Sequence, residues 1–228
     1  MANNYRIKSL IVNSLQHQRQ EYGDQNAGFT MAEMIVVLLM IGILSVIAAP
    51  GWSAFINRQR LNQANGAVAS VIQETRLQAK STKGTYSISF RVKNKINEYI
   101  PEYIIYPGTN LPADPVWIAL GDTMTLRSRE VFLYTNLNPL TEYNTTTADR
   151  QIVQTTLGTG TITFDSQGVL AKKSSGAVSD TPLAIMVAAP VSTNDTASSV
   201  DRCVIIQTLI GGIRIAKDER CRTIPTNE

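Results

Sequence analysis

Apolar residues are concentrated in one run near the N-terminal end of the chain. From Phe29 to Ile56 the only ionisable side chain is Glu33, and Met34–Ala49 consists almost entirely of Met, Ile, Val, Leu, Ala and Gly. About 20 such residues cross a bilayer as a helix, and a carboxylate at the centre of a span costs on the order of a few kcal/mol. The pattern predicts a membrane span with one buried acid.

The helical pattern continues beyond this run. Apolar positions spaced mostly by three and four predict a single stripe that a globular domain covers. Pro50 removes an intrahelical hydrogen bond and clashes with the preceding turn, so we expect a kink at 46–50. A helix that ended at Pro50 would not explain the stripe, and we place the end at 81–84. The stripe comprises Phe55, Leu61, Ala64, Val68, Val71, Ile72 and Leu77.

After the helix the apolar residues alternate with polar ones, which is typical of strands. Residues 86–92 and 98–106 predict a β-hairpin with a polar turn at 93–97. Pro101 predicts that the second strand lies at a sheet edge or contains a bulge. Further along we expect a loop at 107–115, short strands at 116–120, 123–126 and 131–134, and an exposed Thr- and Asn-rich loop at 136–156.

The last third of the chain predicts a second β region. Residues 161–164 and 169–172 form a hairpin around the turn Asp165–Gly168, which has Gly at its last position. An apolar strand at 183–189, a loop at 192–199 and a hairpin of 204–209 with 212–216 follow. The fold class expected is therefore α+β, with a long N-terminal helix, in part transmembrane, packed on an antiparallel sheet domain.

The buried acid needs a cation, and its span contains none. Cleavage after Gly28 would place a new amine on Phe29, one helical turn from Glu33. Gly28, then Phe-Thr-Met-Ala-Glu, then an apolar helix interrupted by Pro50, resembles the class III signal sequence of type IV prepilins and type II secretion pseudopilins. The resemblance implies that prepilin peptidase cleaves after Gly28 and methylates Phe29. It also implies that Glu33 pairs with a neighbouring subunit's amine during assembly, and that Pro50 kinks the helix.

Two other interpretations of the run stay open. A one-step secretory signal peptide would be cut near Ala48-Ala49. Pro50 after that bond makes a poor substrate, and the 28 preceding residues are polar and include acids. An uncut signal anchor is the second alternative.

The resemblance implies a type IV pilin-like fold and the following order of segments. Residues 1–28 are a cytoplasmic leader that is removed, 29–52 the transmembrane and assembly half of the helix, 53–83 its amphipathic half, and 84–228 a periplasmic β-rich domain. We expect a single pass through a bacterial inner membrane, and then a pilus or pseudopilus. The partners expected are prepilin peptidase and other pilins, which contact the N-terminal helix, where Gly42 would allow close approach.

Composition argues against catalysis. The net charge is +3, and +2 without the leader, too mild to indicate nucleic-acid binding by itself. The only histidine, His17, lies in the leader, so the mature chain would lack Ser-His and Cys-His pairs and His-ligated metals. We expect no enzyme activity, no cofactor, no metal and no small-molecule substrate.

The two cysteines, Cys203 and Cys221, lie on the side of the span that the family exports. They are too few for a thiolate zinc site, whereas one disulfide suits an oxidising periplasm. They also flank the last expected hairpin, which could bring them to the separation that a disulfide needs. Two free thiols buried as small apolar groups are the alternative.

A looser resemblance covers about residues 161–221. The order Phe164–Gly168, a cysteine strand, Gly-Gly-Ile-Arg and a second cysteine is similar to the minor pseudopilin and minor pilin group called GspH/FimT. It implies a structural subunit of a type IV pilus or type II secretion pseudopilus. The alternative is a pilus-associated DNA-binding subunit for natural transformation, with phosphate contacts from basic side chains; a solvated charged face would explain the same residues. The candidates for these contacts are Lys172, Lys173, Arg214, Lys217, Arg220 and Arg222.

Overall fold

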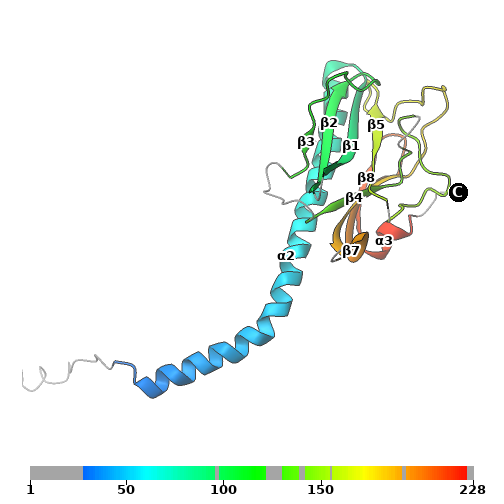
Figure 1. Cartoon of the computed structure of the whole chain (residues 1–228). Helices are drawn as coiled ribbons and strands as arrows, with labels where there is room; N and C mark the ends of the chain where they lie inside the picture. Colours follow the sequence, from blue (N-terminus) through cyan, green and yellow to red (C-terminus); the bar gives the residue numbers. More distant parts are fainter. Residues whose placement is uncertain are drawn as a thin grey trace, which may run out of the picture. The chain divides into compact units, whose positions relative to one another are not determined.

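The computed structural model describes residues 28–95, 98–121, 130–138, 142–154, 156–191 and 194–224. The expected leader, apart from Gly28, and the expected strand at 123–126 lie outside these residues. The chain divides into two compact units, Met1–Gly51 and Trp52–Glu228. Both units contribute to one helix, α2, which runs from Met31 to Thr82 (Figure 1).

Helix α2 continues through Pro50, which confirms that the helix does not end there. The kink expected at Pro50 stays a prediction. At the other end, Lys83 takes a left-handed conformation with φ of 52°. The Gly84 N–H then donates to the Ala79 carbonyl and the Lys83 N–H to the Lys80 carbonyl, a pattern that satisfies the last carbonyls of a helix.

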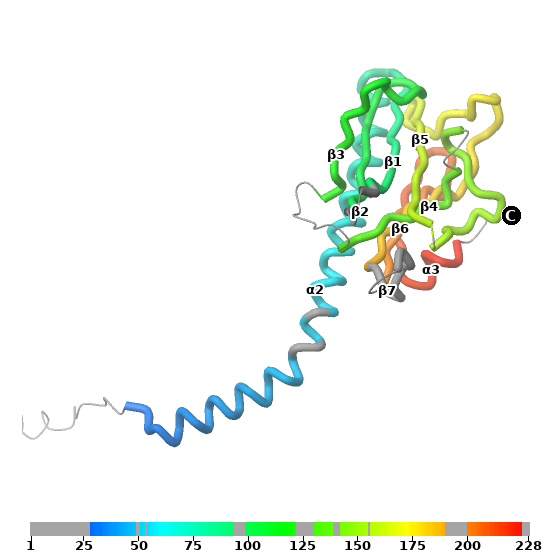
Figure 2. Tube along the Cα trace, in the orientation of Figure 1, coloured from blue at the N-terminus to red at the C-terminus, as the bar shows by residue number. Residues whose placement is uncertain are grey.

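The 52–228 unit contains two four-stranded antiparallel sheets, with strand orders β3-β2-β1-β5 and β4-β6-β7-β8 (Figures 1 and 2). The fold is therefore α+β, with an apolar N-terminal helix followed by antiparallel sheets, as expected from the sequence. The strands are β1 (Tyr86–Lys95), β2 (Glu98–Pro107), β3 (Ile118–Ala119), β4 (Phe132–Thr135), β5 (Gly160–Phe164), β6 (Leu183–Val191), β7 (Asn194–Ile206) and β8 (Ile213–Lys217).

The amphipathic half of α2 packs into the main core of this unit. Its buried positions recur every three or four residues and share one apolar cluster with residues of both sheets. Two residues of the expected stripe, Phe55 and Leu77, are instead exposed. Leu77 follows Ile72 by five residues, which turns it away from the buried face. The buried positions are Leu61, Ala64, Asn65, Val68, Ala69, Val71, Ile72, Thr75 and Ala79.

The first sheet contains the expected hairpin of β1 and β2, but β2 is not an edge strand. It pairs with β1 along its length and with β3 at Glu102 and Tyr103. The Pro101 carbonyl accepts from the Leu120 N–H, on the β3 side. The backbone N and O of one residue point to the same side of a strand, so the nitrogen of Pro101 also faces β3 and not β1. The N–H that proline lacks is therefore not needed for pairing with β1.

The second sheet is buried on both faces. Leu133, Ile185 and Val204 belong to the cluster that contains the helix. Phe132, Met186 and other residues of the same strands form a second cluster with the C-terminal segment, which includes the short helix α3 (Glu219–Arg222). The loop expected at 192–199 is wrong, because β7 begins at Asn194. The start of β7 pairs with the end of β6, but its polar residues lack the apolar alternation that indicates a strand.

Two other hairpins are shorter than expected. The turn at Asp165–Gly168 is present, with φ of 72° at Gly168, but 169–172 forms only one bridge, Leu170 to Phe164. The main partner of β5 is β1, far away in sequence. In the last hairpin β7 ends at Ile206 and β8 begins at Ile213, so the connection is longer than Ile210-Gly211.

The segment expected as an exposed loop, 136–156, is irregular but partly buried where it is described. Asn144 is fully buried; its Nδ2 donates to the carbonyls of Thr163 and Ala171, and its Oδ1 accepts from the Thr163 N–H. Asn136 acts in the same way: its Nδ2 donates to the Arg150 and Pro182 carbonyls, and its Oδ1 accepts from the Ala184 N–H. The amide side chains thus replace missing strand partners, and polarity alone misplaces them at the surface.

Asn144→Ala should destabilise the 52–228 unit by about 3 kcal/mol, because it leaves buried backbone groups unpaired. It also places Ala at a φ of 56°, which Asn tolerates better. Urea unfolding of residues 52–228 measures the change. Asn110→Ala, at an exposed position, is the matched control and should stay within ~0.5 kcal/mol of wild type. Equal stabilities of the two variants would contradict this role of Asn144.

Candidate functional site

The start of α2 is built around Thr30. The Thr30 Oγ1 accepts a hydrogen bond from the Glu33 N–H at 3.2 Å, and the Thr30 carbonyl accepts from the Met34 N–H at 3.2 Å. Thr30 is therefore the N-cap, and Glu33 is an acid in the first turn. A carboxylate there is favourable beside the positive end of the helix dipole.

Gly28 and Phe29 precede this cap outside the helix and are exposed, with Phe29 74% accessible. The peptide bond between them is therefore free of helical hydrogen bonds, a condition that favours entry into a protease site. Cleavage there would leave the Phe29 amine next to the N-cap. The structure thus places the expected cleavage site, Gly28 and Phe29, at the helix start that carries Glu33.

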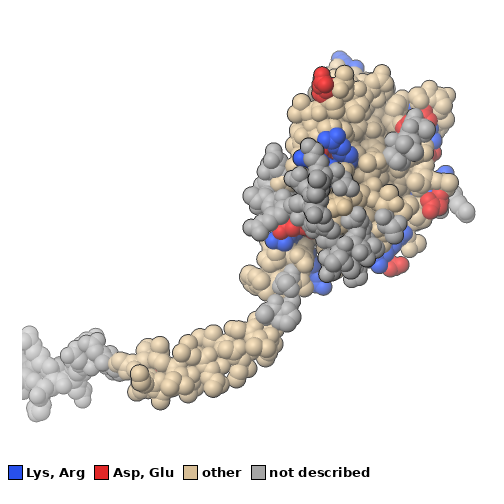
Figure 3. All heavy atoms as spheres, in the orientation of Figure 1, with Lys and Arg blue, Asp and Glu red and all other residues tan. Residues whose placement is uncertain are grey.

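The helix behind this cap has the length and composition of a membrane span. Met31–Ala48 is the one segment among the described residues that qualifies, and none of it is buried in the structure. Figure 3 shows this segment without charged atoms on the visible face. A side chain at Gly42 would meet nothing within 4 Å, so any close packing at Gly42 would be with another molecule.

A second region lies at the C-terminal end, in the 52–228 unit. Cys203 on β7 and Cys221 on α3 form a disulfide with a Cα separation of 5.7 Å, which confirms the predicted bridge. By the chain-entropy argument, such a bridge contributes about 3 kcal/mol. It holds α3 against the second apolar cluster.

Beside the disulfide, Asp201 is fully buried. Its Oδ2 accepts from the Arg222 Nε at 2.9 Å, while its Oδ1 has no hydrogen-bond partner among the described residues. Burial raises the pKa of this carboxyl, against the opposing effect of Arg222. Arg202 next to it donates to Asp218 and to Asn62. The two ion pairs and the disulfide therefore hold residues 218–222 against β7.

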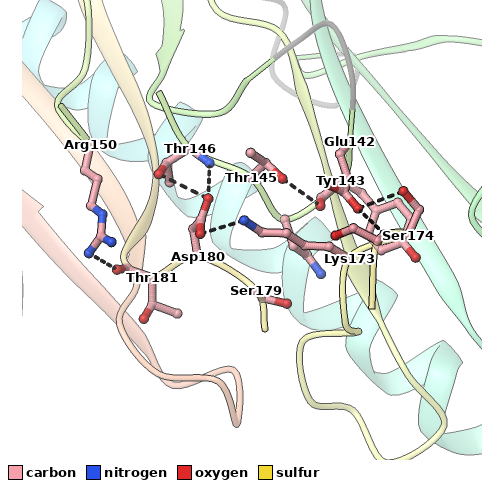
Figure 4. Close-up of polar contacts among 12 residues, drawn as sticks. Glu142, Tyr143, Thr145, Thr146, Arg150, Lys173, Ser174, Ser179, Asp180 and Thr181 are labelled. Carbon is pink, nitrogen blue, oxygen red and sulfur yellow. Dashed lines mark hydrogen bonds and ion pairs between the residues drawn. The ribbon is translucent and has the colours of Figure 1, made fainter. Parts of the chain in front are cut away.

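The structure does not bring the six basic candidates into one surface of free charges. Arg222 is paired with Asp201. Lys173 lies 2.7 Å from Asp180, whose other oxygen accepts from the Thr146 N–H (Figure 4). Burial by itself would raise the pKa of Asp180. The hydrogen bonds from Lys173 and Thr146, together with the positive charges of Lys173 and Arg150, outweigh this effect and lower the pKa. Lys172 is exposed and Arg214 half-buried.

The remaining two candidates, Lys217 and Arg220, are exposed and line an open hollow of about 570 Å³. The hollow lies between α2 and the segment from β8 to α3, and Arg202 also lines it. Asn65, 3% exposed, contributes an Oδ1 that has no partner among the described residues. No group of three or more His, Cys, Asp or Glu side chains suited to a metal ion occurs in the described part of the chain.

Sequence reasoning missed the N-cap role of Thr30 and the ion pairs that Asp201 makes with Arg222 and Arg202 makes with Asp218. The Thr-x-x-Glu spacing at Thr30–Glu33 is a known helix-start signature and could have indicated the first. No sequence signal indicates that Asp201 is buried, because a charged residue followed by Arg202 is typical of the surface.

The family model of the prokaryotic N-terminal methylation motif matches residues 24–49. No curated protein and no solved structure gives a significant match to the chain. The motif supports a type IV pilin-like prepilin that prepilin peptidase processes and that assembles with other pilins. With the apolar helix it also supports anchoring in the inner membrane.

Arg222→Gln should destabilise the 52–228 unit by about 2 to 3 kcal/mol at pH 7, because it orphans a buried carboxylate. The raised pKa of Asp201 means that its ionised form opposes folding, so stability associated with it is greatest at low pH and is lost as the pH rises through the folded pKa. The loss in the variant should therefore shrink in acid. Arg220→Gln, on the same helix, is the control. Urea unfolding at several pH values measures both, and a loss independent of pH would contradict the charge argument.

Proposed function

We propose that the protein is a minor pilin or pseudopilin, a structural subunit of a type IV pilus or of a type II secretion pseudopilus. One observation carries the proposal. An exposed Gly28-Phe29 bond precedes a capped apolar helix whose first turn holds the only acid of the span. The C-terminal domain is then periplasmic, and the mature protein is extracted from the membrane into the filament.

Glu33 has two roles in this proposal. Within its own chain, Glu33 lies near the helix start. A new positive Phe29 amine there would be repelled by the positive end of the helix dipole, and the Glu33 carboxylate offsets this repulsion. Between chains it neutralises the amine of an incoming subunit, which penalises incorrect stagger because a buried charge without a partner is costly. The local role is worth only about 0.3 to 1 kcal/mol, so the second role should dominate assembly.

Within this class we place the protein nearest the GspH/FimT group. The two turns that carry this resemblance are fastened to the helix by one side chain. The Arg76 guanidinium donates to the Gly168 carbonyl at 2.8 Å and to the Ile210 and Gly211 carbonyls at 2.8 and 3.3 Å. The two turns that carry the resemblance therefore belong to one hydrogen-bonded unit with the helix.

DNA binding for natural transformation is the second candidate function. It is favoured by one observation, the presence of exposed Lys217 and Arg220 beside Arg202 around the open hollow. The ion pairs of Lys173 and Arg222 weaken it. A shift assay with residues 52–228 at increasing salt distinguishes the candidates, because phosphate contacts lose affinity steeply with salt. We further propose that the protein has no enzymatic activity.

The mature protein should begin at N-methylated Phe29. The exposed bond after Gly28 gives the peptidase access, and intact-mass measurement of membrane or filament fractions checks the product. Gly28→Ala should slow cleavage, with Gly42→Ala as a control outside the cleavage site. An uncut chain, or a mature start at Pro50, would disprove this prediction.

Glu33→Gln should leave insertion and cleavage nearly unchanged and should lower incorporation into filaments. Removal of the charge makes the span cheaper to insert by about 1 kcal/mol or more, while the amine of a neighbour loses its partner. Quantification in sheared filaments against cellular levels measures the effect. Thr30→Val tests the local role, because it removes the N-cap but keeps the acid. Wild-type levels of the Gln variant in filaments would refute the pairing.

A further inference from the structure

Two large aromatic side chains remain uncovered at the start of the 52–228 unit. Trp52 is 68% and Phe55 57% exposed. They are three residues apart on α2 with ring centroids 6.1 Å apart, so they lie on one face of the helix. Adjacent exposed aromatic side chains form an apolar surface that needs an occupant.

The domain itself cannot be this occupant. Trp52 precedes Leu61 by nine residues, which is about two and a half turns of a helix with 3.6 residues per turn. Trp52 therefore lies on the side of α2 opposite Leu61, which is 1% exposed and belongs to the main core. While Leu61 packs on the sheets, Trp52 points away from them.

After the aromatic pair, this outer face of α2 carries no exposed large apolar side chain until Leu77, 25 residues beyond Trp52. By helical spacing, four exposed residues continue the face of Trp52 and Phe55 toward the C-terminal end of the helix. A partner helix packed along α2 would need an apolar face over several turns, whereas a lipid layer ends at one level. The four residues are Gln59, Gly66, Ser70 and Gln73.

The position along the helix also fits a lipid layer. At about 1.5 Å per residue, the rise from Ala48 to Trp52 is ~6 Å. Headgroup regions extend roughly 5 to 8 Å beyond the hydrocarbon on each side. Trp is enriched at this level because its ring is apolar and its N–H is polar. Exposed Arg58 follows within two turns and suits anionic phosphates.

We propose that Trp52 and Phe55 are a membrane-interface anchor, which packs into the lipid headgroup layer while the protein resides in the membrane. The anchor sets how far Met31–Ala48 descends into the bilayer, and with it the depth of the Gly28-Phe29 bond at the opposite surface. This inference rests on the proposed function, because it requires that Met31–Ala48 spans the membrane.

Tryptophan fluorescence of the full chain in vesicles tests the anchor. The chain has two tryptophans, so Trp117→Phe leaves Trp52 as the only one and Trp52→Phe leaves Trp117. The vesicles contain phosphatidylethanolamine and phosphatidylglycerol, with phosphatidylcholine spin-labelled at a shallow or a deep acyl position. Quenching of Trp52 should be at least about twofold stronger with the shallow label, and Trp117 should be quenched by neither.

Leu77→Trp in a chain that lacks both natural tryptophans is the matched control. Leu77 lies on the same outer face and is 64% exposed, but 25 residues further along, so it should not be quenched. The Arg91 Cζ lies over the Trp117 ring, 4.0 Å from its centroid, so replacement of Trp117 could unfold the domain. In that case the difference between the wild type and Trp52→Phe gives the signal of Trp52.

Three outcomes would overturn the anchor. Trp52 could emit as in water, unquenched by either label, from chains that resist carbonate extraction. It could be quenched more strongly by the deep label, which would place it in the hydrocarbon. It could also be shielded only at high protein-to-lipid ratios, which would assign the surface to a second copy. A chain that does not associate with vesicles would instead disprove the membrane anchoring in the proposed function, and the anchor with it.

Discussion

The structure depends on one long helix that must satisfy its backbone in two different surroundings. Lipid offers no hydrogen-bond partners, so residues 31–48 have to be helical to cross it. The same helix then continues to Thr82 and becomes the central element of the second unit's core. Small residues such as Ala64 and Ala79, both fully buried, let the sheets approach closely. The C-terminal domain is thereby built on the membrane segment's own continuation and not on a separate linker.

Away from the helix, side chains replace the backbone partners that irregular segments lack. The side chains of Asn136, Asn144 and Arg76 each bind three backbone groups of other segments. Asp180 adds the Thr146 N–H and the Lys173 ammonium. Buried backbone groups must be paired, so a domain with short strands and long connections needs such residues. They explain how 130–182, which contains two short strands, can still be well packed where it is described.

The sequence predicted local structure well and long-range pairing poorly. The long helix, the hairpin of β1 and β2, and the disulfide follow from periodicity, turn residues and cysteine spacing, all of which are local. The pairing of β5 with β1 depends on a partner far along the chain. The extension of β7 back to Asn194 pairs with the neighbouring end of β6, but its stretch is polar and lacks the apolar alternation that indicates a strand. The same limit explains the burial of Asn144. Phe55 and Leu77 were misplaced because residue type outweighed helical angle in the expected stripe.

For the candidate site, the difference between Glu33 and Asp201 is instructive. Both are acids in apolar surroundings, one in the expected membrane span and one in the domain core. Asp201 has its cation in the same chain, Arg222, so its cost is met on folding and its role is structural. The Glu33 backbone N–H donates to the Thr30 Oγ1, and from Phe29 to Ile56 the sequence contains no basic residue. On the proposed function its cation is an amine created by cleavage. An acid whose partner is missing until processing and assembly is suited to control when and in which register subunits associate, which a charge paired within its own chain cannot do.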